Sequence, residues 1–218
     1  MSEPVTIPIS YFEVASNYER PQFHLWLDRA AVVSAVFDAL HSWGPTIDDV
    51  DGINTGKTSE QGFAIKLPAK RVSFFFGAAS CKFMRENSDW QSAEETIAIF
   101  DAGISALIHS GGVTLGPKKT AIALHIQPKS AQCIGLLSPF IPAQLAALEA
   151  EPATTMAAVA KWPHRKVTID GSGVVANAIF LRFERDFPTT ASYDEIAAQL
   201  RKDEEELFKL LGVEEDQG

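Results

Sequence analysis

The sequence Val72-Ser-Phe-Phe-Phe-Gly-Ala-Ala-Ser-Cys-Lys-Phe83 is a long apolar run, and it leads through a polar bend into an amphipathic segment that ends at Gly112. Aromatic and β-branched residues in such a run predict a β-strand. Ser92 and Glu95 have the spacing of a helix capping box, which predicts a helix from Ser92 to about Ser110. The apolar stripe of this helix consists of Ile97, Phe100, Ile104, Leu107 and Ile108.

Part of this pattern recurs one hundred positions later. The matches are Phe83 with Phe183, Arg85 with Arg185, Ser92 with Ser192, Glu95 with Glu195, and Leu107 with Leu207. Taken alone, Gly77-Ala-Ala79 suggests a hairpin turn. Because the corresponding segment 174–185 reads as one unbroken strand, we interpret 71–85 as one bent strand whose small residues mark a bulge or a close backbone approach.

Composition and turn residues predict the other elements. Strands are expected at 5–14, 63–67, 119–127 and 166–170, and helices at 28–43, 142–152, 155–162 and 192–211. Residues 45–61 are expected to form a loop. The run Asp203–Glu206 is interpreted as the solvated face of the last helix.

This order predicts an α+β fold of duplicated strand-helix-strand-strand-helix units, with a mainly antiparallel sheet and helices packed on one face. The chain is expected to be a single domain with pseudo-duplicated halves, about 1–115 and 116–212, and a frayed acidic tail at 213–218. Each half alone would leave one sheet face exposed, so we expect the halves to share one sheet and one core.

The composition restricts the classes of partner. The net charge of −9 and the pI of about 5.0 argue against nucleic-acid binding, which depends on Lys and Arg contacts to phosphates. No apolar run approaches the ~20 residues that span a bilayer, and no signal-peptide pattern opens the sequence. Cys81 and Cys133 lack metal-site or disulfide-scaffold spacing and are expected to be free thiols. These features predict a cytoplasmic protein that binds neither membranes nor nucleic acids.

The motifs that carry chemistry are weak. The segment Gly52–Thr58 resembles a phosphate-binding loop, but it is one residue short and no apolar strand precedes it. The acidic residues beside it do not follow a calcium-loop pattern. The histidines lack metal-ligand spacing, and no nucleophile motif is present. We therefore expect no cofactor and no metal, and catalytic residues stay unknown.

One group of residues is a candidate ligand site. His125 alternates with the apolar face of its strand and shares a face with two alanines. If Phe83 and Phe183 point into the core, Lys82 and Arg182 lie on the opposite sheet face. The sequence thus predicts that His125, Lys82 and Arg182 converge on an open sheet surface that suits an anionic or amphiphilic small molecule. The alternative is that all three are ordinary solvated residues of the sheet.

Two resemblances follow from these segments. The element order resembles the duplicated strand-helix-strand-strand architecture of small-molecule-binding proteins, including the gyrase-inhibitor-like and haem-binding SOUL groups. The segments from Phe74 to Gly112 and from Phe180 to Gly212 also resemble a sporadically distributed family of uncharacterised bacterial proteins. The second resemblance implies a bacterial protein, includes no catalytic motif and assigns no functional residue.

The sequence is most consistent with a non-enzymatic binding module for a small molecule or a protein partner. One alternative is a structural or adaptor protein that oligomerises, for example as a homodimer, through its apolar strands. Another is an enzyme whose site is assembled from scattered residues, with His125 among them.

Overall fold

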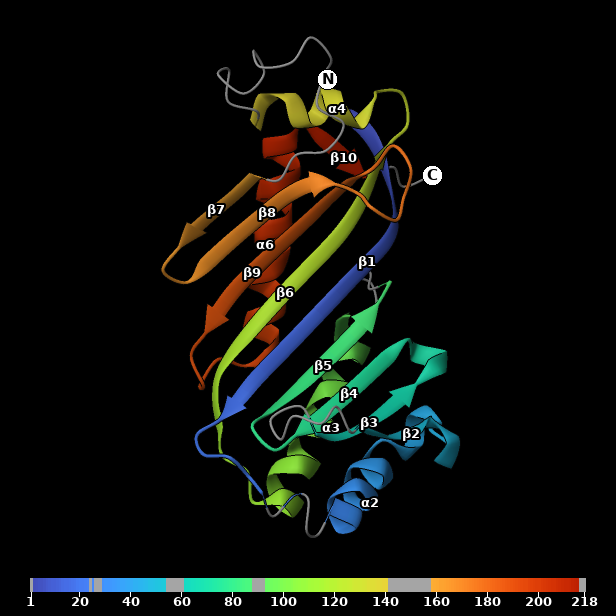
Figure 1. Ribbon diagram of the computed structural model, residues 1–218, viewed down its shortest axis with the longest axis vertical. Coiled ribbons are helices and arrows are strands. Elements are labelled where there is room, and N and C mark those ends of the chain that lie inside the picture. Colours follow the sequence, from blue (N-terminus) through green and yellow to red (C-terminus); the bar gives the residue numbers. More distant parts are fainter. Residues whose placement is uncertain are drawn as a thin grey trace. The chain divides into compact units, whose positions relative to one another are not determined.

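The computed structural model describes residues 2–23, 25, 29–53, 61–87, 93–140 and 158–215 (Figure 1). The chain is an α+β protein with a mainly antiparallel sheet, as predicted from the sequence. Its described helices are α2 (Arg29–Ala39), α3 (Ala93–Gly111), α4 (Cys133–Leu137) and α6 (Tyr193–Leu211). Its described strands are β1 (Glu3–Tyr18), β2 (Val50–Ile53), β3 (Gly62–Leu67), β4 (Val72–Gly77), β5 (Ser80–Glu86), β6 (Leu115–Pro128), β7 (Ala158–Trp162), β8 (Arg165–Gly171), β9 (Ile179–Phe187) and β10 (Val213–Glu215).

The strands follow the order β2-β3-β4-β5-β1-β6-β9-β8-β7 in the sheet. Neighbouring hairpin strands pair antiparallel, whereas β10 pairs in parallel with the start of β1, where Glu3 is opposite Val213. Residues 213–215 are therefore part of the sheet, and the prediction that they fray is wrong. Residues 216–218 of the expected tail lie outside the described part of the chain.

The chain forms two compact units, and β1, β6 and α6 each continue from one unit into the other. The α3 unit comprises Phe12–Thr120 and Asp186–Ala197. The α6 unit comprises Met1–Tyr11, Ala121–Arg185 and Ala198–Gly218. The sequence also predicted two duplicated halves that meet near residue 115. These halves differ from the two compact units, and the duplication stays a prediction.

Aromatic side chains form the centre of the α3 unit. Helices α2 and α3 pack on one face of β3, β4 and β5, and α3 lies behind β5 in Figure 1. The Phe74 ring meets that of Phe83 edge-on at 4.6 Å, and stacks on that of Phe76 at 5.7 Å. A Cβ on Gly103 of α3 would lie closer than 3.0 Å to the Phe74 ring, so only glycine allows this close approach of helix and strand.

Residues 72–86 form a hairpin, not one bent strand. β4 ends at Gly77, β5 begins at Ser80, and the two strands pair antiparallel with Phe76 opposite Cys81. The backbone oxygens of Ala78 and Ala79 accept hydrogen bonds from Gln22 and Tyr18, so the turn is held by a neighbouring segment. The small residues thus allow a close backbone approach, which was one of the two expectations for them, whereas the expected bulge and the continuous strand are wrong.

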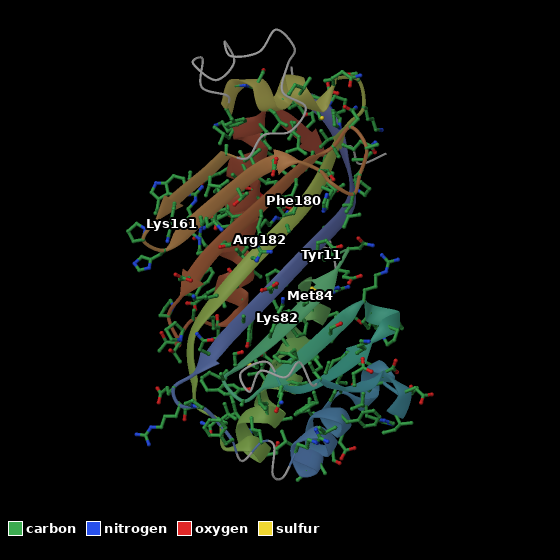
Figure 2. The ribbon with its side chains drawn as sticks, viewed as in Figure 1. Tyr11, Lys82, Met84, Lys161, Phe180 and Arg182 are labelled. Atoms are coloured by element: carbon green, nitrogen blue, oxygen red, sulfur yellow. The ribbon has the colours of Figure 1, made fainter. Side chains whose placement is uncertain are left out.

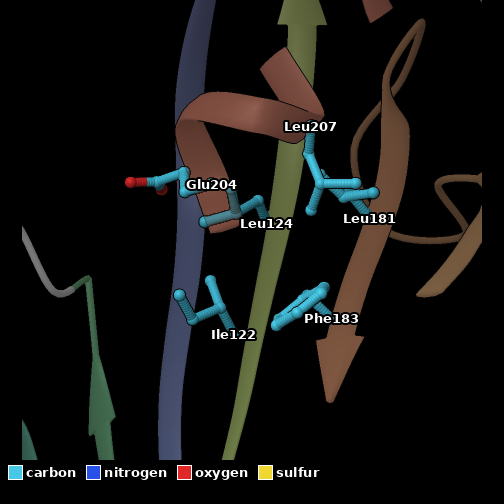
Figure 3. Close-up of a pocket in the computed structure, with 6 residues that line it drawn as sticks. All are labelled: Ile122, Leu124, Leu181, Phe183, Glu204 and Leu207. Atoms are coloured by element: carbon cyan, nitrogen blue, oxygen red, sulfur yellow. The ribbon is translucent and has the colours of Figure 1, made fainter. Parts of the chain in front are cut away.

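The α6 unit has a second, smaller apolar layer. Alternate residues of β6 and β9 point toward α6, which lies behind these strands in Figure 1. Between the layers is a small hollow lined by Ile122, Leu124, Leu181, Phe183, Glu204 and Leu207 (Figure 3). It has room for about one water molecule, so it is a packing defect rather than a ligand pocket.

The segment 174–185, on which the prediction of one unbroken strand was based, is not a continuous strand either. β9 begins only at Ile179, and the loop 172–178 precedes it. Asn177 has a φ of 49°, in the left-handed region that asparagine tolerates better than most residues, and this conformation prevents an extended strand. Residues 158–162 form β7, so the prediction of a helix at 155–162 is wrong for these five residues. Residues 141–157, which include the other helix expected in this region, lie outside the described part of the chain.

Helix termini agree with the sequence where they are described. The Ser192 oxygen accepts from the Glu195 amide at 3.2 Å, and a Glu195 carboxylate oxygen accepts from the Ser192 amide at 2.8 Å. This confirms the second capping box. Ser92 of the first capping box lies outside the described residues, as does Asp28 at the expected start of the 28–43 helix. The expected loop at 45–61 contains the short strand β2, and 54–60 are not described.

One residue in the acidic run of α6, Asp203, is buried. Its side chain is 1% exposed and accepts two hydrogen bonds from the Arg185 guanidinium, Nε at 2.7 Å and Nη2 at 2.6 Å. Gln199 donates to the same carboxylate at 3.1 Å. Asp203 is therefore buried in an ion pair, and the interpretation of 203–206 as a wholly solvated face is wrong for this residue.

Candidate functional site

The three predicted ligand residues fall in different units. Lys82 lies on β5 in the α3 unit, where its Nζ is 2.8 Å from a carboxylate oxygen of Glu13. His125 on β6 and Arg182 on β9 belong to the α6 unit. As expected, Phe83 and Phe183 are buried, while Lys82 and Arg182 are half-buried on the alternate positions. The convergence of all three on one ligand stays a prediction.

His125 contacts a loop of its own chain. The side chain is 7% exposed, its Nδ1 lies 2.8 Å from the Ser172 Oγ, and its ring lies 5.2 Å from that of Phe180. The Ser172 oxygen also accepts from the amides of Val174 at 3.3 Å and Val175 at 2.9 Å, so both of its lone pairs are used and the hydroxyl proton is left to donate to Nδ1. This arrangement favours the neutral imidazole with its proton on Nε2.

The same loop has a second anchor on β6. The Gln127 Nε2 donates to the Ala176 carbonyl at 3.0 Å. His125 and Gln127 therefore hold the 172–178 loop over the face of β6 that α6 does not cover. This contact gives His125 a structural role that its place in the sequence did not reveal, because the segment was interpreted as a strand.

This loop anchor predicts a pH dependence of stability. Burial lowers the pKa of His125, so the unfolded chain, with an ordinary pKa of about 6.5, binds the proton first as the pH falls. The free energy of unfolding should therefore decrease as the pH is lowered through about 6.5, by at most about 1.4 kcal/mol per pH unit from this group. Urea titrations across this range should show a shallower decrease for His125→Gln. Equal slopes for the two proteins would contradict the role.

Arg182 belongs to a cluster of charges on the uncovered face of β7, β8 and β9. The register places Lys161 opposite Lys166, Lys166 opposite Glu184, and Thr168 opposite Arg182. The Arg182 Nε lies 2.7 Å from the Glu184 Oε1, and the Lys166 Nζ lies 3.5 Å from the same oxygen. Figure 2 shows Lys161, Phe180 and Arg182 on this face. We call Lys161, Lys166 and Arg182 the basic row.

The basic row has three cations, and among the described residues it forms ion pairs with one carboxylate, that of Glu184; Asp170 lies on the same face without pairing with the row. Burial opposes ionisation of Glu184, but the hydrogen bond and charge of Arg182, together with Lys166, hold its pKa below the ordinary range. Lys161 is exposed and forms no ion pair with any residue that the structure describes. Like charges directly opposite each other in a sheet are destabilising, so the pair Lys161 and Lys166 is unfavourable in the isolated chain.

Other titratable groups have structural partners. In the α3 unit the buried Lys118 donates to the carbonyls of Thr189 at 2.6 Å and Ala191 at 2.8 Å, and desolvation lowers its pKa. This lysine anchors the turn that precedes α6. Burial also raises the pKa of Cys81 to about 12, so its thiol is protonated and a poor nucleophile. In the described ranges, no group of three or more His, Cys, Asp and Glu side chains could hold a metal ion.

Sequence reasoning found Arg182 but missed Lys161 and Lys166. A signal was present, because Lys161-Trp-Pro-His-Arg-Lys166 is a basic segment in an acidic chain. Because residues 155–162 were predicted to be a helix, Lys161 and Lys166 were not expected to lie opposite each other in a sheet. In the structure Pro163 and His164 form the turn of the β7–β8 hairpin, which brings the two lysines opposite each other.

Comparison of the chain with protein-family models and with curated protein sequences found no match in either case. Within the described residues, no helix has the length and apolar character needed to cross a membrane.

Proposed function

We propose that this chain is a non-enzymatic binding module whose basic row binds an acidic surface of a protein partner. The proposal rests on the arrangement of charges in the basic row. Lys161 lies opposite Lys166 on the face that α6 leaves uncovered, and Glu184 is shared between Lys166 and Arg182. A carboxylate from a partner would relieve this local excess of positive charge, because opposite charges contribute favourably where like charges repel.

The shape of the surface favours a protein over a small molecule. Small ligands bind in concave sites that bury most of their surface. The basic row lies on the outer strands of a sheet face, and the hollow under α6 is apolar and has room for about one water molecule. A broad, shallow contact of this kind is typical of protein partners.

The acidity of the whole chain does not oppose this proposal. The net charge is −9, which would repel an acidic partner at long range. At physiological ionic strength, however, exposed charges are screened beyond about 8 Å. The charges within a few ångströms of the contact therefore determine the sign of the interaction, and Lys161 and Lys166 are the cations nearest the exposed strand β7.

We further propose that the chain arose by internal duplication and functions in the cytoplasm. Two similar runs of strands support the first inference: β5, β4 and β3 extend from β1, and β9, β8 and β7 extend from β6. The free thiols of Cys81 and Cys133 support the second, because reducing compartments keep cysteines unpaired.

Titration of a fluorescently labelled, glutamate-rich peptide tests the proposed function. Lys161→Ala combined with Lys166→Ala should weaken binding about tenfold, because each exposed ion pair contributes up to about 1 kcal/mol. The affinity of the unaltered protein should also fall as salt is raised. Lys202→Ala is the matched control, because it removes an exposed lysine of the same unit from α6. Absence of binding, or equal weakening by the control, would refute the proposal.

A further inference from the structure

The strand β7 lies at one end of the sheet. It is the last strand in the order, and among the described residues only β8 pairs with it. Four of its five residues are exposed, including Val159 at 60% and Trp162 at 49%. An exposed edge of this kind can pair with a strand of another chain through its backbone groups.

The two faces of β7 have different chemistry. The register with β8 puts Val159 and Lys161 on the face of the basic row, because they lie opposite Thr168 and Lys166. Trp162 lies on the other face, where it stacks against the Arg165 guanidinium at 5.2 Å. A strand beside β7 would therefore meet an apolar side chain and a cation, two residues apart, on one face and an aromatic ring on the other.

We propose that β7 binds an extended acidic segment of a partner protein as an added strand. This inference rests on the proposed function, and it specifies the form of the partner. The segment would place an apolar side chain beside Val159 and, two residues away, a carboxylate beside Lys161. The carboxylate would offset the repulsion between Lys161 and Lys166, and the backbones of the two strands would supply the remaining hydrogen bonds.

Charge also discriminates between candidate partners. Lysines on edge strands oppose pairing with apolar strands, and this is one way in which proteins avoid aggregation. A second copy paired through β7 would bring two basic rows together, which costs free energy through like-charge repulsion. Lys161 thus disfavours apolar strands and a second copy of the chain, and it favours an acidic strand. The basic row therefore contributes to specificity as well as to affinity.

The test compares three short peptides with the repeat Val-Thr-Glu-Thr, in which valine and glutamate lie two residues apart on one face of the strand. One peptide is unmodified, and each of the other two carries N-methyl groups on the backbone amides along one of its two edges. N-methylation removes hydrogen-bond donors and keeps the charge. We expect one methylated version to bind about tenfold more weakly, which corresponds to the loss of one or two backbone hydrogen bonds. Amide hydrogen exchange at residues 158–162 should slow when the unmodified peptide is bound.

The outcomes separate this inference from the proposed function. Equal, salt-sensitive binding of all peptides, without protection of β7, would overturn strand addition and leave the basic row as an anion-binding surface. Absence of binding by every peptide would overturn both. If light scattering shows a dimer whose β7 amides are protected without peptide, a second copy occupies the edge and the inference is wrong.

Discussion

The substitution Asp203→Asn should lower the free energy of unfolding by about 3 kcal/mol, the lower end of the range for breaking a buried ion pair. The Asp203 side chain is 1% exposed and receives two hydrogen bonds from Arg185. Asparagine keeps the shape but loses the charge and turns one acceptor into a donor facing a guanidinium. Arg185 would then remain partly buried without its main counter-charge.

Chemical denaturation followed by circular dichroism measures this change. The matched control is Glu205→Gln on the same helix, because Glu205 is exposed and pairs with the exposed Arg201 at 3.5 Å. An exposed pair contributes about 0.2–1 kcal/mol, so the control should have a small effect. If both substitutions had equal effects, Asp203 would be a solvated residue of α6, as first inferred from the sequence, and the buried pair would be refuted.

The substitution Phe74→Ala should lower the free energy of unfolding by about 3–5 kcal/mol, the usual range for truncating a buried phenylalanine. The Phe74 ring is fully buried, packs against Phe76 and Phe83, and fills the space left by Gly103 on α3. Removing the ring leaves a cavity between sheet and helix that rigid neighbours cannot fill.

Phe75→Ala provides the control for this prediction, because Phe75 is the next residue of β4 and points to the opposite face. Its ring is half-buried, so its removal should cost distinctly less free energy than removal of the Phe74 ring. Denaturant titrations of the two variants give the comparison directly. Similar losses would contradict the assigned faces of β4, and with them the hairpin register.

Side-chain alternation could be predicted from the sequence because it depends only on neighbouring residues. Phe83 and Phe183 are buried, and Lys82 and Arg182 lie on alternate positions, as expected. The choice between turn and bulge at 77–79 was wrong, because it relied on a parallel with 174–185. The left-handed conformation of Asn177 removes that parallel.

The burial of Asp203 could have been predicted from its position in the helix. Ile196, Leu200 and Leu207 recur at the spacing of one buried helix face, and Asp203 lies on that face, three residues after Leu200 and four before Leu207. Its helical spacing therefore predicted burial, whereas the acidic run suggested exposure. The partner could not be inferred in this way, because Arg185 reaches Asp203 only through the packing of β9 against α6.

The candidate site was only partly predictable for a related reason. Arg182 was found by alternation within one strand. Lys161 and Lys166 become significant only when β7 and β8 pair in a register that places them opposite each other. That register depends on the turn at Pro163 and His164, which follows a segment that the sequence pattern wrongly predicted to be a helix.

An exchange of charges tests the central claim, that the basic row binds an acidic partner segment. The protein carrying Lys161→Glu and Lys166→Glu is titrated with the glutamate–valine peptide and with its counterpart in which lysine replaces each glutamate. The reversed protein should lose affinity for the glutamate peptide about tenfold or more and gain affinity for the lysine peptide, since each contact changes from attraction to repulsion or the reverse. Unchanged affinity of the reversed protein for the glutamate peptide would contradict the claim.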